Sequence, residues 1–194
     1  MEVWIGRGDP LSAGSPFGML AQAIRKAIGI LDGEPLAVRQ RKLRARVARH
    51  LEGPDLARVT EFLGELLNVP FPDETSVQLR AARQNATLMG DQMRRAFVDW
   101  LTLECGAQPV VLVLEDLHWG DLPTVKFIDA ALRLLEDKPL LVLALARPEV
   151  RDLFPDLWAE RGLQEIKLGE LSKKASEKLV RQILGEAIDA DTVT

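Results

Sequence analysis

The sequence has a single cysteine, Cys105, and no tyrosine, and aromatic residues make up only 5% of it. One cysteine permits neither an internal disulfide nor a cysteine-based zinc site, which favours a reducing, cytoplasmic location. The first residues lack the basic segment and long apolar segment of a signal peptide. The longest apolar runs, residues 109–114 and 139–146, are far shorter than the roughly 20 residues that a membrane-spanning helix needs. We therefore expect a protein without a membrane segment and with a mostly aliphatic core.

Basic residues are fewer than acidic ones, 25 against 29, and the formal net charge is −4. A general nucleic-acid binder needs a basic surface to neutralise phosphates, so the charge balance argues against that class. The exception is a predicted basic helix at 36–51, where six Lys and Arg residues fall between positions 39 and 49. This segment has no interleaved aromatic residues on which bases would stack. We interpret it as a solvated or partner-docking face.

The N-terminal half predicts helices after one short strand at residues 3–5. Ser15 and Pro16 predict a helix start, because Ser is a good N-cap and Pro suits the first helical position. This helix is expected to reach about Leu31. Apolar residues at helical spacing predict three more helices, separated by breaks rich in Gly or Pro, at 36–51, 56–67 and 76–105.

Two continuous apolar runs, 110–114 and 140–146, predict strands buried on both faces, as in a parallel sheet covered by helices. A helix predicted at 122–137 lies between them and completes a strand–helix–strand unit. A helix at 149–160, a short strand at 165–168 and a last helix at 172–187 follow. The pattern indicates an α/β protein with a three-layer α/β/α core.

Acidic residues follow the first of these apolar runs directly. Glu115 and Asp116 come at the carboxyl end of the predicted strand, the edge where open parallel sheets bind ligands. Two adjacent carboxylates need a positive partner, and the usual one is a hydrated Mg²⁺ that carries nucleotide phosphates. Arg147 ends the second run on the same edge, where a guanidinium can contact a terminal phosphate.

Less specific interpretations stay open for each of these residues. Adjacent acids after a strand are often a solvated turn, and Arg147 can be an exposed loop residue. Asp121 precedes a predicted helix and is better explained as its N-cap than as a ligand. His118 is a lone histidine, and such residues are more often packed or capping groups than catalysts.

The residues at these positions resemble a known family. The run Leu-Val-Leu-Glu-Asp-Leu-His-Trp-Gly-Asp at 112–121 is similar to the Walker B region of AAA-type ATPase domains of the STAND class. Proteins of this class are bacterial signalling NTPases, often found beside serine/threonine kinase or cyclase domains. The strand ending in Ala-Arg-Pro-Glu at 146–149 resembles the sensor strand. Residues 6–17 resemble the second strand with its helix, and 165–172 the last core strand before a lid.

The resemblance implies a P-loop NTPase core at 1–171, with a helical insertion at 36–105, and the start of a helical lid at 172–194. It implies ATP and Mg²⁺ as cofactors and the other domains of a larger signalling protein as partners. Glu115 would take the magnesium side, Asp116 would polarise the attacking water, and Arg147 would be the sensor. This sequence has Glu before Asp where many related NTPases have the reverse order, so the division of roles stays open.

One motif of the family is missing. The phosphate-binding Walker A loop contains a Gly-Lys pair, and no such pair occurs in this chain. We expect the loop, with the first strand, to lie upstream of residue 1, and this chain alone to bind ATP weakly or not at all. The absent strand would leave one edge of residues 140–146 unpaired, and such an apolar edge favours a homo-oligomer or aggregation.

Two functions follow from these observations. The first is an ATP-binding and ATP-hydrolysing switch domain of signal transduction, active as an ATPase in the full-length protein. The second is a non-catalytic protein–protein interaction module that keeps the fold and docks partners on its helical surfaces.

Overall fold

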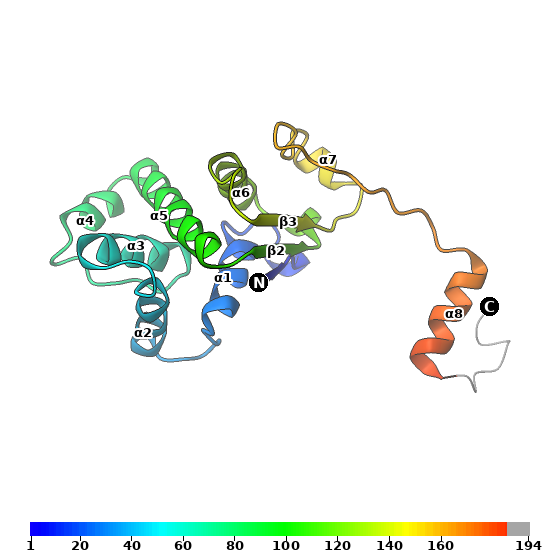
Figure 1. Cartoon of the computed structure of the whole chain (residues 1–194), viewed down its shortest axis with the longest axis horizontal. Coiled ribbons are helices and arrows are strands. Elements are labelled where there is room, and N and C mark those ends of the chain that lie inside the picture. The colour runs from blue at the N-terminus through cyan, green and yellow to red at the C-terminus, as the bar shows by residue number, and fades with distance from the viewer. Residues whose placement is uncertain (186–194) are drawn as a thin grey trace. The chain divides into compact units, whose positions relative to one another are not determined.

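The computed structural model describes residues 1–185, which fall into two units, Met1–Arg161 and the part of Gly162–Thr194 that is described. The first unit contains a parallel sheet of strands β1 (Glu2–Arg7), β2 (Val110–Glu115) and β3 (Leu140–Ala144) in the order β1-β2-β3 (Figure 1). The predicted α/β class with a parallel sheet is therefore confirmed. Within residues 1–185, no helix is both long and apolar enough to span a membrane.

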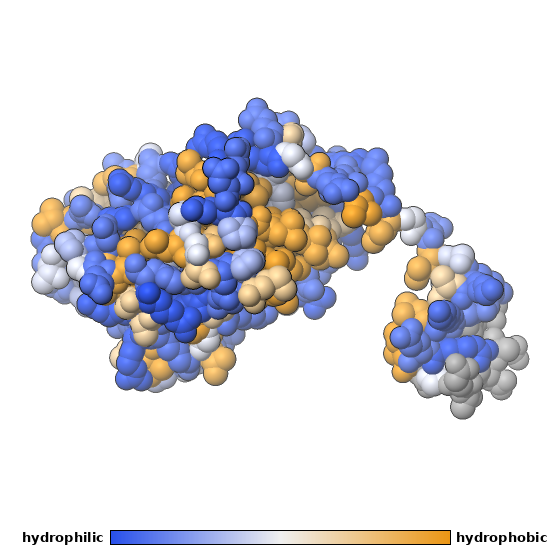
Figure 2. Space-filling model, viewed as in Figure 1, coloured by the Kyte–Doolittle hydropathy of each residue, from blue (hydrophilic) through white to orange (hydrophobic). Residues whose placement is uncertain are grey.

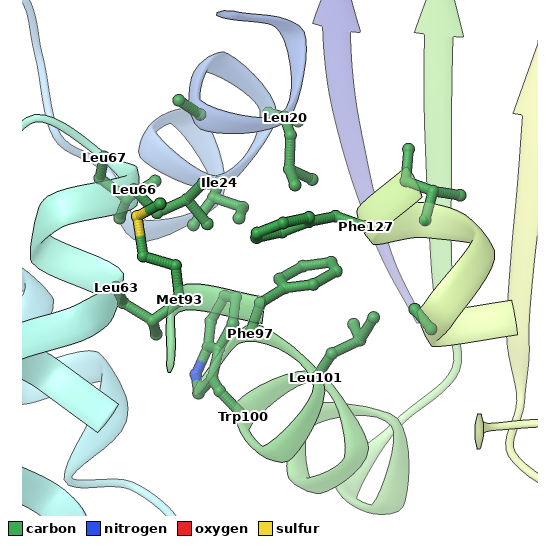
Figure 3. Packing of buried hydrophobic residues seen from close by; sticks show 14 of the residues in the cluster. Leu20, Ile24, Leu63, Leu66, Leu67, Met93, Phe97, Trp100, Leu101 and Phe127 are labelled. Atoms are coloured by element: carbon green, nitrogen blue, oxygen red, sulfur yellow. The ribbon is translucent and has the colours of Figure 1, made fainter. Parts of the chain in front are cut away.

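One face of the sheet carries the hydrophobic core. Trp4, Leu112 and Val142 are partners in the strand register and point to this face. Helices α1 (Gly18–Ile28), α5 (Ala86–Ala107) and α6 (Leu122–Leu134) supply the rest of the core. Figure 3 shows side chains from all three helices meeting around two phenylalanines, Phe97 and Phe127, whose ring centroids are 6.2 Å apart. The indole of Trp4 stacks on that of Trp100 at 5.1 Å, which joins β1 to α5.

The opposite face of the sheet is largely exposed. Val3 and Leu141 are 50% and 59% exposed, and Ile5 and Leu143 are also exposed. The register brings these side chains together, because Val111 and Val113 lie between them on β2. Figure 2 shows apolar residues at the surface over the region of the strands. The prediction that the strands are buried on both faces is wrong for the described residues, because α1, α5 and α6 all pack against the same side.

Four helices form a block beside the sheet: α2 (Leu36–Val47), α3 (Gly53–Leu66), α4 (Val77–Arg83) and α5. The single helix predicted over 76–105 is wrong, since the chain breaks between α4 and α5. Asn85 has extended backbone angles there, and its side chain accepts the N–H of Leu88 at 3.1 Å. Asn85 therefore acts as the N-cap of α5, a role that short polar side chains fill well.

A buried ion cluster attaches this helical block to the sheet. Arg46 of α2 donates two hydrogen bonds to Glu104 of α5, at 2.8 and 2.6 Å. Its Nη2 also donates to Glu2 of β1 at 2.5 Å. The side chains of Arg46 and Glu104 are only 6% and 2% exposed. Hydrogen bonding to Arg46 lowers the pKa of Glu2 below its usual value, because the guanidinium stabilises the charged carboxylate.

Two predicted helix boundaries shift for identifiable reasons. The helix expected from Ser15 and Pro16 begins only at Gly18, because Phe17 takes a left-handed conformation (φ 61°) and its N–H bonds to Asp121 instead. The helix expected at 149–160 is reduced to α7 (Val150–Leu153). The residues that follow form turns, and Trp158 among them donates to the carbonyl of Val125 at 3.1 Å. Tertiary contacts therefore hold this segment in a non-helical path.

The second unit contains α8 (Lys173–Leu184), which Ser172 caps by accepting the N–H of Ala175 at 3.3 Å. The strand predicted at 165–168 is absent from the described residues, and Ile166 and Leu168 are 73% and 87% exposed. A short segment with two apolar residues becomes a strand only where a neighbouring strand pairs with it. Residues 186–194 of the predicted lid, which include the end of the helix expected at 172–187, lie outside the described residues, and the domain division at 171/172 stays a prediction.

Candidate functional site

The two acids predicted as the site lie at the carboxyl edge of the sheet. Glu115 is the last residue of the central strand β2, and Asp116 follows it. Each side chain is 42% exposed. The carboxylates are therefore accessible from solvent while their backbone is held by the middle strand of the sheet.

The chain turns sharply directly after Glu115. Asp116 adopts a left-handed conformation (φ 55°, ψ 43°), which Asp tolerates better than most residues. Its carbonyl accepts the N–H of Trp119 at 2.8 Å and closes a short 3-10 helix, Leu117–Trp119. The buried side chain of Leu117 anchors this turn in the core. We refer to residues 115–119 as the acid turn.

A glycine directly after the neighbouring strand β1 allows the acid turn to lie close to it. Gly8 donates its N–H to the carbonyl of Glu115 at 2.8 Å. A Cβ atom at Gly8 would lie 2.3 Å from the carbonyl oxygen of Asp116 and 2.9 Å from the Cβ of Trp119. Neither distance is possible without a shift, so only glycine fits at this position.

Arg7 contributes a positive charge that the sequence analysis missed. Its Nε lies 3.3 Å from Asp116 Oδ2 and 3.6 Å from Glu115 Oε2. Arg7 pairs with Glu115 in the strand register. A basic residue at the end of the first strand could therefore have been recognised in the sequence as a candidate partner of the acids. The Arg7 side chain is 66% exposed, and ion pairs this exposed contribute only about 0–1 kcal/mol. A bound cation can therefore displace it.

Arg147 lies on the same edge, as predicted, three residues beyond β3. The ladder between β2 and β3 continues past the strand ends, since Leu145 donates to the carbonyl of Leu114 and Leu117 donates to that of Leu145. The backbone N–H of Arg147 then donates to Nδ1 of His118 at 3.3 Å. Within residues 1–185, no ion pair joins the Arg147 guanidinium to either acid, and its role as sensor stays a prediction.

Asp121 is an N-cap, as the sequence predicted. It is 3% exposed, and its Oδ1 accepts the N–H groups of Thr124 and Phe17 at 2.8 and 2.9 Å. Its Oδ2 accepts the Thr124 hydroxyl at 2.8 Å. Asp121 therefore starts α6 and fixes the segment before α1, and both of its carboxylate oxygens are engaged by these partners.

The donor set fits a hydrated magnesium ion. Mg²⁺ in nucleotide sites is bound by one or two carboxylates and completes its shell with water and phosphate oxygens. Glu115 and Asp116 provide two accessible carboxylates. Among the described residues, no group of three or more His, Cys, Asp or Glu side chains is placed to hold a metal ion entirely by itself. The arrangement is suited to a metal that arrives with a phosphate ligand.

A comparison with protein families identifies a related domain family. The family model described as an AAA ATPase domain matches residues 3–143. This range includes nearly all of β1 and β3 and the whole acid turn, and it ends before Arg147. Searches of the curated proteins and of the solved structures give no match.

Proposed function

Because the chain belongs to the AAA ATPase domain family, we propose that its acid turn is the magnesium–nucleotide site of an ATP-hydrolysing switch. The observation that carries the proposal is the pair of accessible carboxylates at the carboxyl end of the central strand. They are balanced by the exposed and displaceable Arg7. An edge of this kind is where open parallel sheets bind ligands.

Each residue of the site has a proposed role. Glu115 holds the magnesium ion and Asp116 orients the attacking water, although their roles can be exchanged. Arg147 contacts the terminal phosphate and responds to its loss. Magnesium, when bound, supplies positive charge that neutralises the triphosphate.

We propose that the phosphate-binding loop comes from a segment preceding Met1. The chain itself contains no Gly-Lys pair that could form this loop. The exposed sheet face supports this proposal, and so does the edge of β3 that pairs with no strand of residues 1–185, because an additional strand and helix would cover both. Such cover would complete the three layers expected from the sequence. Without the additional strand, the apolar edge of β3 favours pairing with a second copy of the chain.

The biological setting is part of the proposal. We propose that the chain is a STAND-class domain of a larger, cytoplasmic bacterial signalling regulator. Domains of this class are often joined to a serine/threonine kinase domain. Its partners are the neighbouring domains of that regulator. Nucleotide bound at the acid turn would bias the packing of the lid that begins at Ser172, and cleavage of the terminal phosphate would relax it.

The test is ATP turnover by the chain joined to the residues encoded before Met1. We expect Glu115→Gln and Asp116→Asn each to lower turnover by about 100-fold, as for loss of a catalytic carboxylate. Asp137→Asn is the matched control, because Asp137 is an exposed acid that precedes β3 at the opposite edge. Wild-type turnover that both acid variants leave unchanged would exclude this site. Complete absence of turnover in the wild type would favour the alternative, a non-catalytic interaction module.

A further inference from the structure

His118 is buried in the acid turn with an unusual set of partners. The residue is 7% exposed, and its ring lies 5.0 Å from that of Trp119. Nδ1 accepts the backbone N–H of Arg147 at 3.3 Å. Nε2 is buried and has no partner among the described residues. Because Nδ1 is the acceptor, the proton of the neutral ring belongs on Nε2.

The position of this hydrogen bond follows from the ladder between β2 and β3. In a regular parallel ladder, the N–H of Arg147 would donate to the carbonyl of Asp116, two residues beyond the bond from Leu145 to Leu114. That carbonyl is not available, since Asp116 is left-handed and its oxygen accepts the N–H of Trp119. The imidazole of His118 supplies the missing acceptor. Its ring thus extends the ladder by one hydrogen bond after the main chain has turned away.

This hydrogen bond also holds the backbone around Arg147, which makes few other hydrogen bonds. Pro148 has no N–H, and the next backbone bond of the described chain is from Val150 back to the carbonyl of Arg147. Arg147 itself is exposed. The direction in which the Arg147 side chain leaves the sheet therefore depends on His118.

We propose that His118 is a positioning residue that couples the acid turn to Arg147. A displacement of the acid turn moves the His118 ring and, through it, the backbone of Arg147. The catalytic consequence rests on the proposed function, whereas the hydrogen bond itself does not. His118 contacts neither nucleotide nor metal in this account.

Two substitutions separate the hydrogen bond from simple packing. In His118→Asn the side-chain oxygen occupies about the place of Nδ1 and can accept the N–H of Arg147. In His118→Gln the amide reaches the place of Nε2 and leaves that N–H without an acceptor. By NMR hydrogen exchange we expect the Arg147 amide to be protected in the wild type and in the Asn variant. In the Gln variant it should exchange about tenfold faster, as for the loss of one hydrogen bond.

The amide of Leu145 is the internal control, because it bonds to Leu114 and not to His118. Faster exchange at Arg147 with unchanged exchange at Leu145 supports the proposal. Equal exchange at Arg147 in all three proteins would overturn it. If neither variant folds, NMR of the wild-type protein still tests the proposal. A ring proton of His118 found on Nδ1 rather than on Nε2 would overturn the proposal, because Nδ1 could then not accept the N–H of Arg147.

Turnover of ATP by the extended chain gives the second measurement. We expect His118→Gln to lower kcat to the level of Arg147→Ala, with no further loss in the double variant, and His118→Asn to restore most of it. Additive losses would contradict the coupling. Absence of turnover in the wild type would reject the proposed function alone, because the exchange of the Arg147 amide would still report the hydrogen bond.

Discussion

Nε of Arg7 lies 3.3 Å from Oδ2 of Asp116, although 109 positions separate the two residues in the sequence. The contact exists because β1 and β2 are parallel neighbours and both residues stand at their carboxyl ends. It places a protein cation against the carboxylates that we propose for magnesium. Arg7 and a metal ion therefore compete for the same oxygens.

This competition predicts the effect of Arg7→Gln. Removing the guanidinium should tighten the binding of Mn²⁺, used in place of Mg²⁺, by up to about fivefold, since an exposed ion pair contributes at most about 1 kcal/mol. The affinity is measured by electron paramagnetic resonance of the free ion. Arg41→Gln, an exposed arginine on α2, is the control and should have no effect. Weaker binding in the Arg7 variant would show that the arginine does not compete.

Gly8→Ala tests whether close packing places the acid turn. The added methyl would meet the carbonyl of Asp116 at 2.3 Å, so the turn must move. We expect a loss of stability of about 1–3 kcal/mol, typical of overpacking, and weaker Mn²⁺ binding. Gly90→Ala is the control, because nothing lies within 4 Å of the added atom. Alanine there should stabilise α5 by about 0.5–1 kcal/mol. Unchanged metal binding in the Gly8 variant would contradict this account.

Arg46→Met tests the ion cluster between the helical block and the sheet. The substitution keeps the aliphatic chain but removes both hydrogen bonds from Arg46 to the buried carboxylate of Glu104, which then keeps only His50 Nε2 at 3.5 Å. Breaking a buried pair in this way costs about 3–5 kcal/mol. Urea denaturation measures the difference, and Arg44→Met on the exposed face of the same helix should change it by less than about 0.5 kcal/mol. Similar midpoints for the two variants would mean that the cluster contributes little.

Cys105 is predicted to be unreactive in the folded protein. The residue is 1% exposed, and burial raises the pKa of its thiol to about 11. Only the thiolate reacts with disulfide reagents, and at pH 8 a group with this pKa is almost entirely protonated. Reaction with an aromatic disulfide at pH 8 should be about 100-fold slower for the native chain than for the chain in urea. It should accelerate as the pH is raised toward 11. Equal rates in the two states would contradict the burial of this thiol.

Several features of the fold were predictable because they depend on local sequence. The continuous apolar run before Glu115 indicates a core strand, and the carboxyl-edge rule then places the acids. Asp121 was predictable as a cap because it precedes a helix with Pro at its start. The start of the last helix was also predictable, since the helix expected from residue 172 begins at Lys173. In each case the informative residues are neighbours in the chain.

Other features depend on tertiary contacts that no local pattern contains. An apolar run shows that a strand can be buried on two faces, but not that a second layer is present, as the exposed Leu141 illustrates. The break at Asn85 is hidden by apolar residues that keep helical spacing on both sides. The contact between His118 and Arg147 requires knowing that Asp116 is left-handed. Arg7 could have been found by the reasoning that identified Arg147, since both end a strand on the same edge.

The claim that Glu115 and Asp116 hold a divalent cation is tested most directly by locating bound Mn²⁺ on the chain by NMR. The account predicts that low concentrations of Mn²⁺ first broaden the amide signals of the acid turn and of Gly8. Excess Mg²⁺ should reverse this broadening, and both Glu115→Gln and Asp116→Asn should reduce it. Broadening that is absent from the acid turn, or that both variants leave unchanged, would contradict the account.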